Sequence, residues 1–129
     1  MFRYYVNGTT MKMKEILRVA ERTARKSPCR FKVSCILVDQ TGDIVATGYN
    51  HYGTKKRMMG KPTVHAEVDA LNKVRKPSPN LTAFIYRDNG KLITPCKSCQ
   101  RLLAVYGIRT VWHSIGIGEG MKKWNKGGI

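Results

Sequence analysis

The chain has 129 residues, with 24 Lys and Arg against 8 Asp and Glu, which gives a formal net charge of +16. Its length fits one domain of the commonest size, and its hydrophobic content of 42% is that of an average globular protein. No apolar run approaches the roughly 18 residues that a membrane-spanning helix needs, which excludes a helical membrane protein.

The N-terminal residues and the cysteines indicate the cellular compartment in which the protein is expected. The stretch MFRYYVNGTT contains no apolar segment of the kind found in secretory signals, so we expect a soluble, cytoplasmic protein. Disulfides are not expected there, and the four cysteines are predicted to be thiols or metal ligands.

The positive charge is spread along the chain, with eight basic residues in 12–32, four in 55–61 and three in the segment 115–129. A field of this sign concentrates anionic partners, such as nucleotides, nucleic acid or acidic surfaces, without choosing among them. We therefore expect a phosphorylated or polyanionic partner, with solubility alone as the alternative role of the charge.

The first half of the chain predicts a helix followed by a β-hairpin. Residues 11–26 carry an apolar stripe at helical spacing, and Ser27-Pro28 ends the helix. The stripe consists of Met13, Ile16, Leu17, Ala20 and Ala24. FKVSCILV at 31–38 and IVATGYN at 44–50 flank turn residues and predict the hairpin. The polar, basic residues 51–62 predict a loop.

In the second half, two helices alternate with two strands. Val64, Val68 and Leu71 predict a helix that stops near residues 76–80. LTAFIY at 81–86 and RTVWHS at 109–114 predict strands. The third helix is expected to begin at Pro95 and to be capped by Gly107.

The order of these elements predicts an α/β protein with one mixed sheet and helices on its faces. We expect a single domain over residues 1–129, with its core at about 12–114. Residues 115–129 are rich in glycine and lysine, show no periodicity and are expected to form a tail.

Two motifs predict a metal site. His65 and Glu67, in VHAEVDAL, lie at the start of the second helix. PCKSC follows 29 residues after Glu67 and places Cys96 and Cys99 on the first turn of the third helix, so both sulfurs reach one ion. The helix N-terminus is expected to lower the pKa of both thiols. His65 supplies a third ligand if the helix starts face each other, and three protein ligands leave one position open, as in catalytic zinc sites.

Glu67 is placed to move a proton. It lies two residues past His65, where a carboxylate approaches a metal-activated water without binding the metal. HxE alone occurs by chance, and CxxC alone serves redox dithiols, structural zinc or catalytic zinc. Together they favour catalytic zinc. The main alternative is a structural site that recruits Cys29 or Cys35, although Cys35 is expected to be a small buried hydrophobe.

With these motifs the chain resembles the cytidine and deoxycytidylate deaminase family over roughly residues 12–114. The resemblance rests on GYN at 48–50, HAEVDAL at 65–71 and TPCKSCQ at 94–100, since HxE followed by PCxxC is typical of zinc nucleobase deaminases. It implies a three-layer fold, a five-stranded mixed sheet with helices on both faces. It also implies a cytoplasmic hydrolase of pyrimidine metabolism that converts cytosine to uracil and ammonia, with one zinc ion per chain, and a homo-oligomer.

The resemblance implies roles for single residues. The zinc ligands it implies are His65, Cys96 and Cys99, with Glu67 as the catalytic proton shuttle. The substrate contacts it implies are Asn50 to the sugar, and the backbone of Ala66 and Thr94 to the base and its amino group. Ile93-Thr94 before the Pro-Cys is closer to the cytosine branches than to the tRNA-adenosine and guanine branches, which usually have an acidic residue there.

The loop 51–63 leads from Asn50 to the zinc helix and is expected to border the pocket mouth. Tyr52 is predicted to stack on a base or ribose. The residues predicted to hold a 5′-phosphate are Lys55, Lys56, Arg57 and Lys61. A solvated loop that contacts nothing is the alternative.

Two substrate classes remain open. We favour a free pyrimidine nucleoside or nucleotide such as cytidine or dCMP, because the domain is minimal. The alternative is single-stranded DNA or RNA, with the helix at 12–26 and the KKWNK tail following the backbone and Trp124 stacking on a base. A noncatalytic module with a structural zinc is a third possibility, against which an intact Glu67 argues.

Overall fold

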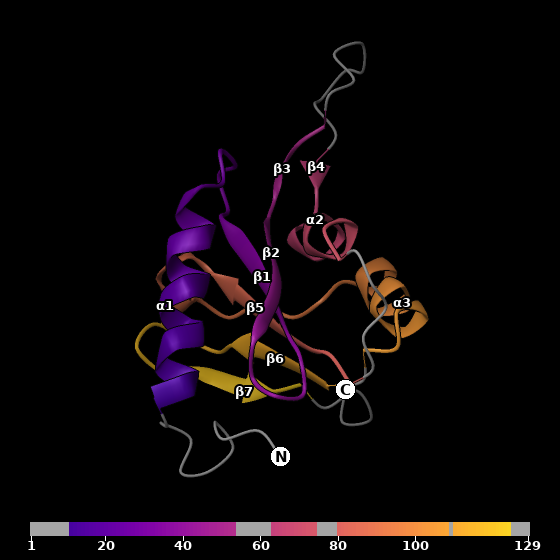
Figure 1. Ribbon diagram of the computed structural model, residues 1–129. Coiled ribbons are helices and arrows are strands. Elements are labelled where there is room, and N and C mark those ends of the chain that lie inside the picture. The colour runs from indigo at the N-terminus through magenta and orange to yellow at the C-terminus, as the bar shows by residue number, and fades with distance from the viewer. Residues whose placement is uncertain (1–10, 54–62, 75–79, 109, 125–129) are drawn as a thin grey trace.

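The structure is a computed structural model that describes residues 11–53, 63–74, 80–108 and 110–124 (Figure 1). Its elements, in chain order, are α1 (Met11–Arg25), β1 (Val33–Val38), β2 (Ile44–Tyr49), β3 (His51–Tyr52), β4 (Thr63–Val64), α2 (Ala66–Asn72), β5 (Thr82–Arg87), the 3₁₀ turn η2 (Asp88–Gly90), α3 (Lys97–Val105), β6 (Thr110–Ser114) and β7 (Met121–Lys123). Among these residues, no helix is both long enough and apolar enough to cross a membrane.

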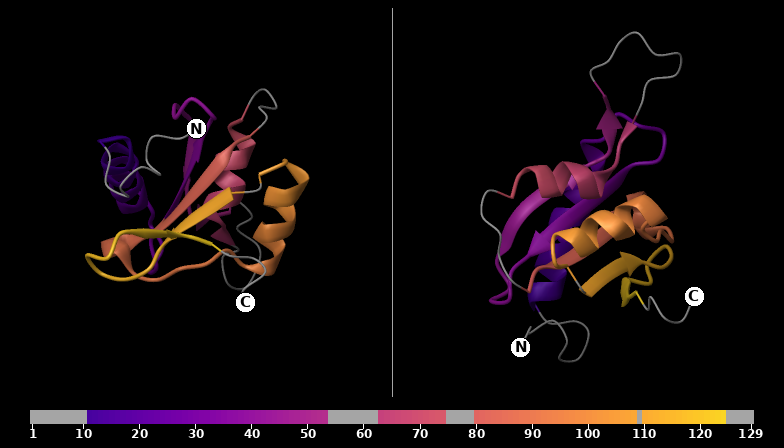
Figure 2. Two further views of the ribbon diagram at one scale, coloured as in Figure 1. Left: turned by 90° about the horizontal axis from the view of Figure 1, so that it is seen from below. Right: turned by 90° about the vertical axis from the view of Figure 1, so that its right-hand side faces the viewer.

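Five strands form one mixed sheet in the order β2-β1-β5-β6-β7. β1 is antiparallel to both of its neighbours, β5 and β6 are parallel, and β7 is antiparallel to β6. α1 covers one face of the sheet, and α2 and α3 cover the other (Figure 2). The predicted three-layer α/β fold is therefore confirmed.

Alternation along β1 builds two apolar cores. Val33, Cys35 and Leu37 pack on the side of α2 and α3, whereas Ile36 and Val38 pack on the side of α1. Successive side chains of a strand point to opposite faces, and both faces of this strand are covered. That double cover explains why the sequence shows an unbroken apolar run here. The apolar stripe of α1 is likewise confirmed, since its buried members are Met13, Ile16, Ala20 and Ala24.

A glycine in β2 lets α2 lie directly on the sheet. A Cβ added at Gly48 would lie 2.4 Å from the backbone nitrogen of Ala70 and 2.6 Å from the carbonyl oxygen of Ala66. Any side chain at this position would push the helix outward. Gly48 therefore fixes the height of α2 above the sheet, and with it the position of His65 and Glu67.

Several predicted element limits are wrong. Val64 lies in β4, and the buried face of α2 consists of Ala66, Glu67, Ala70 and Leu71. The apolar pattern missed this face because one of its members is a carboxylate. α3 begins at Lys97, two residues after Pro95. Gly107 is confirmed as its cap: it has a φ of 77°, and the next residue, Ile108, donates its N–H to the carbonyl of Leu103 at 2.9 Å.

Three short strands were not predicted. β3 and β4 pair with each other within the segment expected to be a loop. β7 lies in the segment expected to be a tail, and it supplies the fifth strand of the sheet. The predicted end of the second helix near residues 76–80 is wrong, because α2 ends at Asn72 and Lys73 is its C-cap residue.

Candidate active site

The starts of α2 and α3 bring three metal-binding side chains together. His65 is the N-cap residue of α2, Cys96 is the N-cap residue of α3, and Cys99 lies in the first turn of α3. His65 Nδ1 lies 3.2 Å from Cys99 Sγ and 3.5 Å from Cys96 Sγ. All three ligand atoms lie within 4.8 Å of one another.

These distances fit a tetrahedral zinc ion. Zn–N bonds of about 2.0 Å and Zn–S bonds of about 2.3 Å separate neighbouring ligand atoms by about 3.5 to 3.8 Å. The observed separations lie close to that range, and His-Cys-Cys is a donor set that leaves a fourth position open. Neither Cys29 nor Cys35 belongs to the cluster, so the described residues give no support to a structural site that recruits them. Cys35 is fully buried in the core, as expected.

The two thiols differ in acidity. Burial opposes ionisation of Cys96, but hydrogen bonds with Ser98 and with the backbone of Cys99 outweigh it and lower the pKa of Cys96 to about 7. Burial, followed by the negative charge of Glu67, raises the pKa of Cys99 well above its ordinary value. The expectation that the helix start lowers both thiol pKa values is therefore confirmed for Cys96 and wrong for Cys99.

Glu67 lies beside the cluster in a desolvated setting. Its side chain is buried, with 5% of the residue exposed. Burial raises the pKa of the Glu67 carboxyl, and its own backbone N–H, His65 and Cys99 offset only part of that rise. A carboxyl group whose pKa is raised above its ordinary value binds a proton more readily, which suits it to accept and return one.

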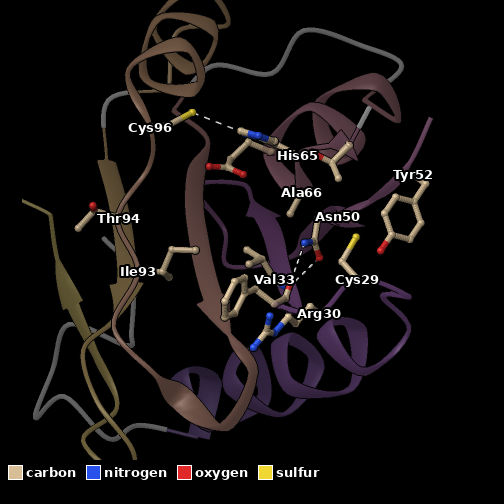
Figure 3. A pocket seen from close by; sticks show the side chains of 13 residues that line it. Cys29, Arg30, Val33, Asn50, Tyr52, His65, Ala66, Ile93, Thr94 and Cys96 are labelled. Atoms are coloured by element: carbon tan, nitrogen blue, oxygen red, sulfur yellow. Dashed lines mark hydrogen bonds between the residues drawn. The ribbon is translucent and has the colours of Figure 1, made fainter. Parts of the chain in front are cut away.

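A cavity of about 420 Å³ opens beside these residues (Figure 3). This volume lies in the range of about 300 to 1,000 Å³ that is common for small-ligand sites. The residues that line it are Cys29, Arg30, Phe31, Val33, Asn50, Tyr52, Thr63, His65, Ala66, Glu67, Ile93, Thr94 and Cys96. The structure thus brings Asn50, Tyr52, Ala66 and Thr94, predicted substrate contacts, to the same pocket as the metal cluster.

Asn50 supports the pocket wall. Its Oδ1 accepts a hydrogen bond from the backbone N–H of Val33 at 2.8 Å, and its Nδ2 donates to the carbonyl of Phe31 at 2.6 Å. One N–H and one acceptor lone pair of the amide remain beyond these two bonds. A contact to a sugar stays a prediction, and the two backbone bonds show a positioning role that the sequence did not indicate.

The structure does not support the remaining predicted ligand contacts. Lys55, Lys56, Arg57 and Lys61 lie outside the described residues. Trp124, expected to stack on a base, is instead half-buried against the core on the side of α2 and α3.

Sequence reasoning also missed part of the pocket lining, namely Cys29, Arg30, Phe31, Val33 and Ile93, whereas Thr63 belongs to the loop 51–63 that was expected to border the pocket. A usable signal was the placement of residues 29–33 just before and at the start of β1, because pairing of β1 with β2 brings this segment beside Asn50.

Comparisons with known proteins agree with the site. The chain matches the cytidine and deoxycytidylate deaminase zinc-binding region over residues 10–115. No curated protein matches it in sequence. Among solved structures, the dCMP deaminase from the cyanophage S-TIM5 is similar, with 27% identity, 81% of this chain and 84% of that chain covered, and a TM-score of 0.62.

Two further structures share the fold. The structure of the S-TIM5 enzyme in complex with dCMP and dUMP is 24% identical, covers 81% of this chain and 82% of that chain, and has a TM-score of 0.60. The cytidine deaminase from Burkholderia pseudomallei is 18% identical, covers 93% of this chain and 95% of that chain, and has a TM-score of 0.67.

Proposed function

Because the chain belongs to the cytidine and deoxycytidylate deaminase family, we propose that it is a zinc-dependent hydrolase that converts the cytosine of a free nucleoside or nucleotide to uracil and releases ammonia. The observation that carries this proposal is the cluster of His65, Cys96 and Cys99, of which His65 and Cys96 line the same pocket as the buried Glu67. A structural zinc has no use for a carboxylate at that position.

Different side chains hold the metal and transfer the proton. A zinc ion held by His65, Cys96 and Cys99 would supply a water molecule activated as a nucleophile near neutral pH. Glu67 accepts a proton from the water that adds to C4 of cytosine and returns a proton to the amino nitrogen. The C4–N bond then breaks, so that water and cytosine become uracil and ammonia. Glu67 can serve in both directions because burial raises its pKa.

The pocket walls supply the selectivity for an amine. Ala66 and Thr94 line the pocket, and we propose that a backbone carbonyl there binds the amino group of cytosine. Uracil offers an oxygen at that position, so the same acceptor is left without a donor. A buried polar group left unpaired is costly, which favours release of the product.

Two observations favour a free nucleoside or nucleotide over a polymer. The similar S-TIM5 enzyme has been solved with dCMP and dUMP. In this chain, Trp124, which a polynucleotide track was expected to use, is partly buried against the core.

The proposal is tested with a substrate panel: cytosine, cytidine, deoxycytidine, CMP, dCMP and a cytosine-containing oligonucleotide. Zinc-loaded protein should release ammonia, and form the uracil product, from at least one free nucleoside or nucleotide. Conversion of the oligonucleotide alone would establish the polynucleotide alternative. No conversion of any compound by protein that carries one zinc ion would refute deamination of cytosine.

A further inference from the structure

The end of the pocket farthest from the metal ligands carries an unpaired positive charge. Arg30 lines the cavity and lies across it from Cys96 and His65 (Figure 3). Among the described residues, none of the ion pairs involves Arg30, and Glu67 is the one acidic residue of the pocket lining. A cation that lines a pocket without a carboxylate partner is available to a ligand anion.

A second cation reinforces the first. The guanidinium carbons of Arg30 and Arg87 lie 5.7 Å and 4.6 Å from the centroid of the Phe31 ring. The ring face attracts and orients both groups. Arg87 Nε is buried and has no hydrogen-bond partner among the described residues. Two like charges beside one ring repel each other, and a bound anion relieves that repulsion.

The backbone that presents Arg30 is held in place. Asn50 bonds to the backbone of Phe31 and Val33 on one side of it. On the other side, Lys32 Nζ donates to the carbonyl of Cys29 at 3.3 Å. A cation on a fixed segment loses less conformational entropy when it binds an anion than one on a freely moving segment does.

The shape of a cytosine nucleotide matches this arrangement. C4, which must reach the metal, lies across the pyrimidine ring from N1, which carries the sugar. The 5′-phosphate is attached beyond the sugar and therefore lies at the end of the molecule opposite to C4. In the pocket, Arg30 lies at the end opposite to His65 and Cys96, as the 5′-phosphate lies at the end of the nucleotide opposite to C4 (Figure 3).

From these observations we infer that Arg30 binds the 5′-phosphate of a mononucleotide and makes this pocket select cytosine nucleotides over nucleosides. The inference rests on the proposed function. A phosphate monoester carries a charge of about −1.5 to −2 at pH 7, so the positive field of Arg30, and of Arg87 outside the pocket lining, attracts it more strongly than the single charge of a phosphodiester. Arg30 would contact the phosphate with its planar fork, and Arg87 would add to the field.

The experiment compares kcat/KM for dCMP with kcat/KM for deoxycytidine in wild type and in Arg30→Gln. The ratio of the two should fall by about 10- to 100-fold, which is the usual worth of a charge-assisted hydrogen bond. The ratio for Arg30→Lys should lie between the ratios for wild type and Arg30→Gln, because lysine keeps the positive charge and loses the planar guanidinium group. Arg18→Gln, an exposed arginine of α1 outside the pocket lining, removes the same charge and should leave the ratio unchanged.

Two results of the comparison would overturn the inference. The ratio could stay unchanged in Arg30→Gln, whether both kcat/KM values hold or fall together as for a structural defect, or Arg18→Gln could lower the ratio as much as Arg30→Gln does. Conversion of an oligonucleotide but not of dCMP by the wild type would also overturn it.

A binding experiment distinguishes failure of the proposed function from failure of the phosphate contact. If the wild type converts no substrate, calorimetry of dUMP against deoxyuridine still tests Arg30. A preference for dUMP that is lost in Arg30→Gln supports the phosphate contact, and equal binding of the two compounds refutes it.

Discussion

Replacement of Gly48 by alanine tests how α2 is held above the sheet. The new Cβ would lie 2.4 Å from the nitrogen of Ala70 and 2.6 Å from the carbonyl oxygen of Ala66, where ordinary contacts begin at 3.4 Å. Both neighbours are helix backbone, which cannot rotate aside as a flexible side chain can. The helix must therefore move outward by about 1 Å, and overpacking of this kind costs about 1 to 3 kcal/mol of stability.

The displacement acts on the metal cluster as well as on stability. His65 moves with α2, whereas Cys96 and Cys99 stay with α3. The distances of 3.2 Å and 3.5 Å from His65 Nδ1 to the two sulfurs therefore change by a large fraction of the movement. Loss of a support for a ligand lowers metal affinity by about 10- to 100-fold, and we expect this range for Gly48→Ala.

Chelator competition measures the zinc affinity, and urea denaturation measures the free energy of unfolding. Gly118→Ala is the matched control, because nothing lies within 4 Å of its added Cβ while its φ of +75° still disfavours alanine. The control should lose about 1 kcal/mol of stability and keep its zinc affinity. Wild-type stability and wild-type zinc affinity in Gly48→Ala would refute the close-packing argument.

Three further predictions concern the metal cluster and the pocket wall. Cys99→Ser should lower the zinc content of the purified protein, measured by atomic absorption. Cys35→Ala should keep one zinc ion per chain, because Cys35 lies in the core outside the cluster. Equal zinc loss in both variants would contradict the ligand assignment. A chelator should abolish ammonia release and added zinc should restore it, whereas full activity of metal-free protein would exclude the proposed chemistry. Asn50→Ala should cost about 0.5 to 1.5 kcal/mol in urea denaturation, because it removes the partly buried hydrogen bond to the N–H of Val33 and the exposed one to the carbonyl of Phe31. An unchanged midpoint would show that these bonds contribute nothing.

The metal cluster was predictable because local geometry determines most of it. Helical geometry sets the spacing of Cys96 and Cys99, and His65 and Cys96 each lie at the N-cap of a helix. What the sequence could not show is that the two helix starts meet. That contact depends on both helices lying on the same face of the sheet, and the resemblance of the motifs supplied it.

Other features depend on tertiary contacts that leave no local pattern. β7 has three residues, MKK, without alternation, and it is a strand because β6 pairs with it. The buried face of α2 contains Glu67, so an apolar pattern could not find it. Arg30 is one of 24 basic residues, and only the fold shows that it lines the pocket.

The central claim is that Glu67 moves the proton while His65, Cys96 and Cys99 hold the zinc. The most direct test measures zinc content and ammonia release from dCMP or cytidine, whichever the wild type converts, in wild type and in Glu67→Gln. The account predicts one zinc ion per chain in both proteins and a turnover about 100- to 10,000-fold lower in the variant, the usual worth of a general acid–base group. Wild-type turnover in zinc-loaded Glu67→Gln would contradict it.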